Sequence, residues 1–126
     1  MAVVLQTLVD SDFEHVVKIT TTGTNSAATV VDASSLTGHD SGPKLSIVAC
    51  QWSVGSQTDI LFDATSNVVA LSLNGNGAFN TSQSLPTIKN NAGSGVTGDV
   101  LLTNSSASVG FIILKLKKTD GYDNLD

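Results

Sequence analysis

The sequence predicts an all-β fold, either an antiparallel sandwich or a small barrel, with about eight strands. Three observations support this prediction. Every apolar stretch is short and rich in β-branched residues. Turn residues separate the stretches at intervals of about 8–15 residues, and no stretch shows the period of an amphipathic helix. At 126 residues, the chain has the size of a single domain that can bury a core without disulfides or metal.

Eight segments carry the strand pattern. In chain order they are residues 2–9, 14–21, 27–32, 44–54, 58–63, 67–73, 98–103 and 109–118. The last segment alternates most regularly, because Ile112, Leu114 and Leu116 fall on one face of the predicted strand. Lys115 and Lys117 fall on the other face, which is therefore expected to meet solvent.

The segment KLSIVACQWSV, residues 44–54, changes its alternation part-way. Leu45 and Ile47 share one face of the strand, whereas Val48 and Cys50 share the opposite face. A β-bulge near Ile47–Val48, or burial on both faces, explains the switch.

Three further segments complete the single domain of residues 1–126. Residues 1–13 contain an apolar N-terminal arm, and residues 119–126 form a loose acidic tail. The interval from Gly75 to Thr97 contains a proline and the glycine-rich NNAGSGVTG, so we expect a long crossover or surface loop there.

The composition narrows the range of partners. Charged residues make up 13% of the chain, roughly half of the ~25% usual for a soluble domain, and such a surface suits contact with other proteins. The net charge is −5 and arginine is absent, so we expect no nucleic-acid partner. The N-terminal apolar run lacks a basic leader and is shorter than the about 20 residues that span a bilayer, so we expect no membrane partner.

Few side chains are available for catalysis. Cys50 with His15 or His39 is formally a nucleophile and base, but Cys50 lies mid-strand and is expected to be a small buried hydrophobe. His39 beside Asp40 is interpreted as a solvated loop pair. We assign no catalytic residue and expect the protein not to be an enzyme.

Two loops carry oxygen ligands at the spacing of a cation site, Asp10-Ser-Asp12 and Asn74-Gly-Asn76. Neither is followed by the bidentate glutamate of a calcium loop, and single aspartates commonly cap turns. The glycine-rich loops also lack the Lys-Ser/Thr pair and the helix of a phosphate loop. We assign no metal and no cofactor.

The remaining candidates belong to an interface. The apolar leader AVVLQTL can add as an edge strand to a neighbour. Trp52, Phe62 and Phe111 are expected in the core, and the other three aromatic rings lie at or beyond strand ends. The predicted interface residues are Val3, Val4, Leu5, Leu8, Phe13, Phe79 and Tyr122.

The order of several segments resembles a group of small structural proteins of tailed phages, many of them marine, and most of all their capsid decoration or cement proteins. The likeness covers most of residues 16–118. Its most distinctive pieces are QWSV (51–54), LFDAT (61–65) and GVTGDVLLTN (95–104). These are strand and turn motifs, and none of them is catalytic.

The resemblance implies a jelly-roll-like β-sandwich that binds the outside of a phage head and bridges major capsid protein subunits. It also implies a location on the virion surface after synthesis in the host cytoplasm, and a homo-oligomer, with a trimer favoured. Two alternatives remain open. One is a phage tail or adaptor subunit, and the other is a carbohydrate-binding β-sandwich module, which would need several exposed aromatic rings on one face.

Overall fold

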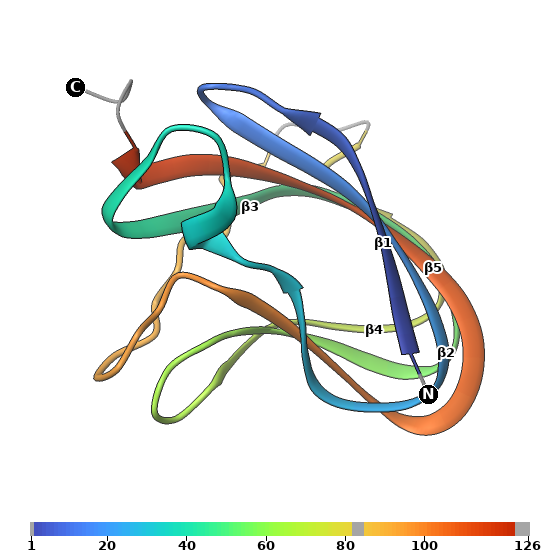
Figure 1. The fold of residues 1–126 in the computed structure, drawn as a ribbon. Helices are drawn as coiled ribbons and strands as arrows, with labels where there is room; N and C mark the ends of the chain where they lie inside the picture. The colour runs from blue at the N-terminus through green and yellow to red at the C-terminus, as the bar shows by residue number, and fades with distance from the viewer. Residues whose placement is uncertain (1, 82–84, 123–126) are drawn as a thin grey trace.

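The structure is a computed structural model that describes residues 2–81 and 85–122. It is all-β, as the sequence predicts, and Figure 1 shows the course of the chain. The elements are β1 (Ala2–Asp10), β2 (Glu14–Val31), the short 3₁₀ helix η1 (Ala33–Ser35), β3 (His39–Phe62), β4 (Val68–Phe79) and β5 (Val100–Tyr122).

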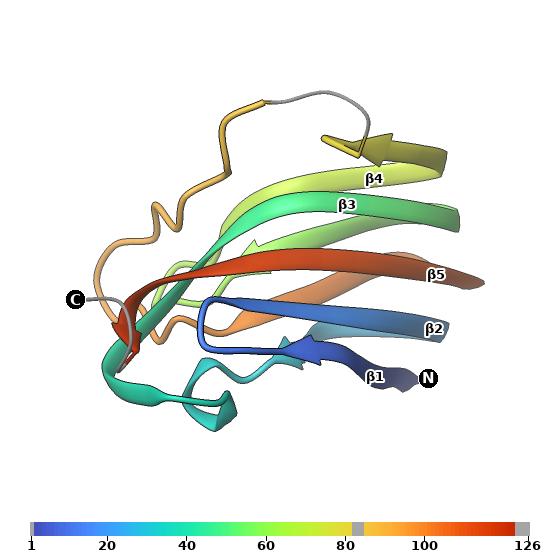
Figure 2. The same ribbon diagram turned by 90° about the horizontal axis from the view of Figure 1, so that it is seen from above.

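All five strands belong to one antiparallel sheet in the order β1-β2-β5-β3-β4. Figure 2 shows this order directly, with β1 and β4 at the two edges. The sheet curls on itself into a small barrel-like shape, so that the two halves of each long strand face one another across the core (Figure 1). The predicted all-β class is confirmed, but the sheet closes into a small barrel with extra strands and is not clearly the predicted sandwich.

The structure has five long strands instead of the eight predicted ones. The reason is that some predicted turns bend a strand without ending it. The register of β2 on β5 shifts between Gly23 and Asn25, where Gly23 has a φ of 71°. The buried Asn104 side chain takes over the backbone bonds at this bend: its amide donates to the Gly23 carbonyl at 2.6 Å, and its oxygen accepts from the Asn25 amide at 2.8 Å.

The core lies between the two halves of the curled sheet. The predicted alternation in β5 is confirmed, since Ile112, Leu114 and Leu116 are fully buried and Lys115 and Lys117 are exposed. Other large, fully buried side chains are Ile19, Leu45, Ile47, Ile60, Phe62 and Leu102. Each such side chain stabilises the fold by about 1.5–3 kcal/mol relative to an exposed position.

The predicted irregularity in residues 44–54 is a bulge at Val48. Ile47 pairs with Leu116 and Ala49 pairs with Lys115, so Val48 is an extra residue in β3. The bulge lets Ile47 and Cys50 both face the core.

The predicted long loop is present between β4 and β5, although β4 itself continues to Phe79. One pair of backbone bonds attaches this loop to β3, because Ile47 and Ile88 each donate to the other's carbonyl at 2.8 Å. The loop therefore lies against the sheet at a fixed point.

The predicted strand at residues 2–9 is present, whereas the predicted loose tail needs correction. Most of the arm at residues 1–13 is β1, which pairs with β2 of its own chain from Ala2 to Asp10. Residues 119–122, expected in a loose tail, form the end of β5. The remainder of the predicted tail, residues 123–126, lies outside the described residues.

Candidate functional site

The strand β1 forms one edge of the sheet and is the candidate interaction site. It pairs with β2 on one side, and within residues 2–81 and 85–122 no strand pairs with its other side. Its sequence, AVVLQTLVD, contains no proline and no charge before Asp10. Edge strands that stay unpaired usually carry charges, prolines or a cover that blocks pairing. The outer edge of β1 lacks the first two of these devices.

Exposed apolar side chains line this strand on both faces. Val4 is 61% exposed, Leu8 is 45% exposed and Leu5 is 44% exposed. The register slips between Thr7 and Val9, so Leu8 is a bulged residue. Several exposed apolar side chains on one edge strand favour a contact with another protein.

The turn after β1 adds Phe13, whose side chain is 57% exposed. The backbone of the turn is held firmly, because the Ser11 amide donates to the Glu14 carbonyl at 2.9 Å and the Lys118 amide donates to the Phe13 carbonyl at 2.8 Å. Beside the ring lies a shallow, mostly apolar depression that Val48 also lines. The exposed phenyl ring thus extends the apolar surface beyond β1.

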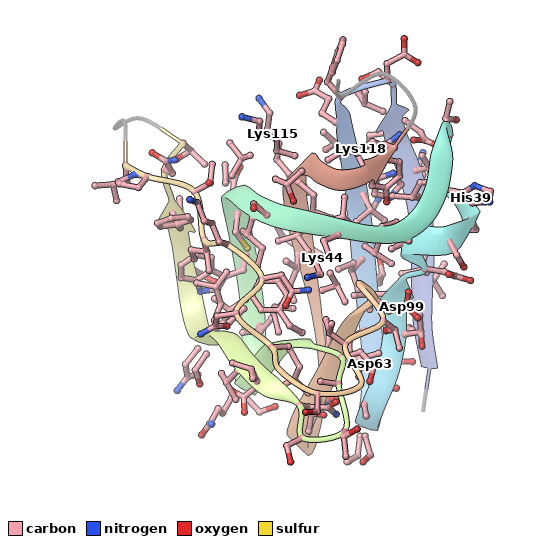
Figure 3. The ribbon with its side chains drawn as sticks, turned by 90° about the vertical axis from the view of Figure 1, so that its left-hand side faces the viewer. His39, Lys44, Asp63, Asp99, Lys115 and Lys118 are labelled. Carbon is pink, nitrogen blue, oxygen red and sulfur yellow. The ribbon has the colours of Figure 1, made fainter. Side chains whose placement is uncertain are left out.

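A buried lysine fixes this end of β1. Lys118 lies at the end of β5 beside the β1–β2 hairpin (Figure 3), and its side chain is fully buried. Its ammonium group donates to the Asp10 carboxylate at 2.7 Å, to the Thr37 carbonyl at 2.7 Å and to the Ser11 carbonyl. These three bonds use all three ammonium protons and join β5, the β1–β2 turn and the segment after η1.

The same network sets the protonation states near the turn. Burial acts to raise the pKa of Asp10, but hydrogen bonds from Lys118 and from the Thr37 amide and hydroxyl lower it below its usual value. Burial lowers the pKa of His15, against the attraction of the Asp10 carboxylate. Because Lys118 and Thr37 donate hydrogen bonds to the Asp10 oxygens, this carboxylate anchors the turn and is not available as a ligand for a metal ion.

Sequence reasoning missed Lys118, although one signal pointed to it. Lys118 continues the parity of Leu114 and Leu116, which face the core. The charge of Lys118 favours an exposed position. The acceptors that compensate the burial of its ammonium group lie 81 to 108 residues away in the sequence.

Four of the predicted interface residues are exposed on β1 or in the turn after it: Val4, Leu5, Leu8 and Phe13. Val3 lies on the same strand but is half-buried against the core, and Phe79 is half-buried on β4, at the opposite edge of the sheet. The prediction for Tyr122 is wrong. Tyr122 is buried, and its hydroxyl donates to the Ala33 carbonyl at 3.0 Å, because β5 extends further than predicted.

The other aromatic predictions have mixed outcomes. Phe62 is fully buried, as expected, but Phe111 is exposed on the outer face of β5. Trp52 is half-buried against the core, and its indole N–H donates to the Asn74 carbonyl at 3.2 Å. A Cβ atom on Gly77 would lie 2.5 Å from the Trp52 ring, so the indole packs directly on the β4 backbone.

The candidate nucleophile is shielded. Cys50 is buried, as predicted, and burial raises the pKa of its thiol to about 12. A thiol with this pKa is not ionised at neutral pH and is a poor nucleophile. Among the described residues, no group of three or more His, Cys, Asp or Glu side chains is arranged to hold a metal ion.

Comparison with known proteins gives no relative. The sequence matches no protein-family model, and no curated protein or solved structure matches it. Within the part of the chain that the structure describes, no helix is long and apolar enough to cross a membrane.

Proposed function

We propose that this protein is a non-enzymatic structural subunit that binds other proteins through the edge of β1. One observation carries the proposal: an exposed edge strand that has no charge before Asp10 and bears Val4, Leu5 and Leu8. An unpaired strand supplies backbone donors and acceptors for a ladder with a second strand, and its side chains supply apolar area to bury. The Lys118 network holds this edge in place before any partner arrives.

The assembly we propose is the outer surface of a phage head. The protein would act as a decoration protein that bridges major capsid protein subunits, and it would be made in the host cytoplasm before joining the virion. Support comes from the resemblance of residues 16–118 to decoration proteins and from the low charge of the surface. We propose no nucleic-acid partner, no membrane partner and no cofactor for the protein.

We further propose that the occupant of the β1 edge is a second copy of this chain, within a homotrimer. In such a trimer the β1 edge of each copy contacts a different surface of the next copy, because head-to-tail contacts of this kind can close a ring. A trimer presents three capsid-binding surfaces at once, and avidity then converts weak single contacts into stable attachment. Because the bound protein favours the assembled head, it raises the stability of the shell, by about 2.7 kcal/mol per site at a hundredfold excess over Kd.

We also propose a more specific description of the fold. We infer that the curled sheet is a flattened, jelly-roll-like sandwich whose two layers are the halves of β2, β3 and β5. The bends at Gly23–Asn25 in β2 and at Val54–Thr58 in β3 support this inference.

The test is a double substitution, Val4→Lys with Leu8→Lys, which places charges on the free edge. Val69→Lys is the matched control, because Val69 is 53% exposed on the opposite edge strand. The wild type and the control are expected to show three times the 12.9 kDa mass of one chain in solution, and the double variant is expected to be a monomer. A monomeric wild type contradicts the trimer.

Head binding tests the remainder of the proposal. Purified wild-type protein is expected to bind heads that lack it and to raise the temperature at which they break open, whereas the double variant does neither. Saturating wild-type protein with no effect on the heads contradicts the role on the capsid. Attachment only to tails assigns the protein to the tail or adaptor class.

A further inference from the structure

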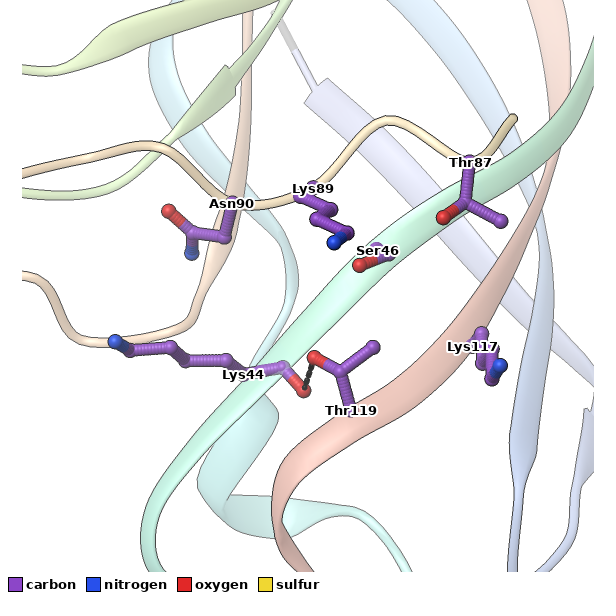
Figure 4. Close-up of a pocket in the computed structure, with 7 residues that line it drawn as sticks. All are labelled: Lys44, Ser46, Thr87, Lys89, Asn90, Lys117 and Thr119. Carbon is purple, nitrogen blue, oxygen red and sulfur yellow. Dashed lines mark hydrogen bonds between the residues drawn. The ribbon is translucent and has the colours of Figure 1, made fainter.

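A polar cleft with a volume of about 300 Å³ lies on the outer face of the sheet. Figure 4 shows the side chains around it, which come from three segments of the chain. They are Lys44 and Ser46 of β3, Lys117 and Thr119 of β5, and Thr87, Lys89 and Asn90 of the loop between β4 and β5.

The fold fixes these three segments against one another. Ser46 is the register partner of Lys117 in the β3–β5 ladder, and the Thr119 hydroxyl donates to the Lys44 carbonyl at 3.2 Å (Figure 4). The paired backbone bonds between Ile47 and Ile88 hold the loop against β3. The cleft is therefore a feature of the folded chain and does not require a partner to form.

The charge in the cleft is opposite to that of the whole protein. The net charge is −5, yet three of the six lysines line the cleft, and among the side chains that the structure describes no carboxylate does. Among the described residues, none of these three lysines forms an ion pair, whereas Lys115 lies 3.8 Å from Glu14 and Lys118 binds Asp10. The cleft thus contains three cations without a described counter-charge.

A second observation points to a missing acceptor. The Asn90 side-chain oxygen accepts from the Ala92 amide at 3.0 Å, which orients the side chain. Its nitrogen is buried and has no hydrogen-bond partner among the described residues. A buried donor without a partner is costly and uncommon in native proteins. An acceptor supplied from outside the chain would satisfy it.

We propose that this cleft binds a phosphate group, either inorganic phosphate or the phosphate of a small molecule. The three lysine side chains place positive charge around the cleft, with Lys44 and Lys117 extending toward opposite sides of it in Figure 4, and hydroxyl and amide groups supply further donors. Lysine binds phosphate as a point charge, so the lack of arginine is no obstacle. This inference is independent of the proposed function.

The experiment is an NMR titration of ¹⁵N-labelled protein with sodium phosphate, and separately with glucose 6-phosphate, against sodium chloride at equal ionic strength. Saturable shifts are expected for the backbone amides of Ser46 and Lys89 and for the side-chain amide of Asn90, with phosphate but not with chloride. Tighter binding in one arm identifies the source of the phosphate group. No saturable shift in either arm overturns the proposal.

Substitutions give the matched control. Lys89→Gln and Lys117→Gln are each expected to weaken binding about tenfold, which corresponds to the loss of one hydrogen bond to a charged group. Lys18→Gln removes the same charge on β2, outside the cleft, and is expected to leave binding unchanged. All three variants should keep the wild-type unfolding midpoint, because none of these lysines is buried. Equal losses in all three variants, or no loss in any, overturn the proposal.

Discussion

Replacing the buried Lys118 with methionine should destabilise the protein severely. Methionine retains most of the aliphatic stem but cannot donate hydrogen bonds. The Asp10 carboxylate and the carbonyl groups of Ser11 and Thr37 would each lose a donor. The cation would also be lost from its position 5.1 Å from the centroid of the Tyr122 ring.

The expected cost follows from these three acceptors. A buried polar group left without its partner costs about 1–3 kcal/mol. The Asp10 side chain is 23% exposed and keeps its bonds from Thr37, so its share is at the low end. We expect a total loss of about 3–5 kcal/mol, the range found when one partner of a buried ion pair is removed. For a domain of this size the melting temperature should fall by about 10–20 °C.

Urea unfolding followed by Trp52 fluorescence measures this loss. Lys115→Met is the matched control, because Lys115 is exposed and its contact with Glu14 spans 3.8 Å. A surface pair of this kind contributes about 0–1 kcal/mol. If Lys118→Met and Lys115→Met destabilise the protein equally, the assignment of Lys118 as the anchor of the β1–β2 turn is wrong.

Three further predictions test the interior. Burial lowers the pKa of His15 below the usual 6.5, so the unfolded state binds more protons than the folded state. The free energy of unfolding should therefore fall as the pH drops through 6.5. Urea unfolding at several pH values should show that this free energy depends less steeply on pH in His15→Leu than in the wild type. The Cys50 thiol, with its pKa raised to about 12, should resist a thiol reagent in native protein at neutral pH and react once urea unfolds the chain; rapid labelling of native protein would refute its burial. Gly98→Ala should cost about 1–3 kcal/mol or more in thermal unfolding, because Gly98 has a φ of +85° and its Cβ would collide with the Pro43 carbonyl oxygen. Gly42→Ala, at φ +68° in open space, should cost less, and equal costs would show that the collision is unimportant.

The local features of the fold could be predicted from the sequence. The alternation of residues 109–118 and the change of parity at Ile47–Val48 both correspond to observed features, a buried strand face and a bulge. These properties depend on side chains that are neighbours along the strand, so a single segment carries the information.

The features that the sequence did not reveal depend on distant contacts. Gly23 and Asn25 are typical of a turn, yet the strand continues through them because Asn104 binds both backbones from about 80 residues away. Tyr122 follows acidic residues that suggest a loose end, but it packs inside and bonds to Ala33, 89 residues earlier.

Of the two candidate sites, one is visible in a single segment of the sequence and the other depends on contacts between distant segments. The apolar β1 edge is visible as the run AVVLQTL, and Val4 and Leu8 on it are exposed, whereas its role as an interface stays a prediction. The lysine cleft has no local motif, because Lys44, Lys89 and Lys117 meet only through the β3–β5 register and the bridge of the loop to β3.

An image of the assembled particle tests the central claim most directly. Reconstruction of the virion by electron cryo-microscopy should show copies of this chain on the outer face of the head, in groups of three, with the β1 edge of each copy against its neighbour. Density for the chain confined to the tail, or a head-bound chain whose β1 edge faces open solvent, would contradict the account.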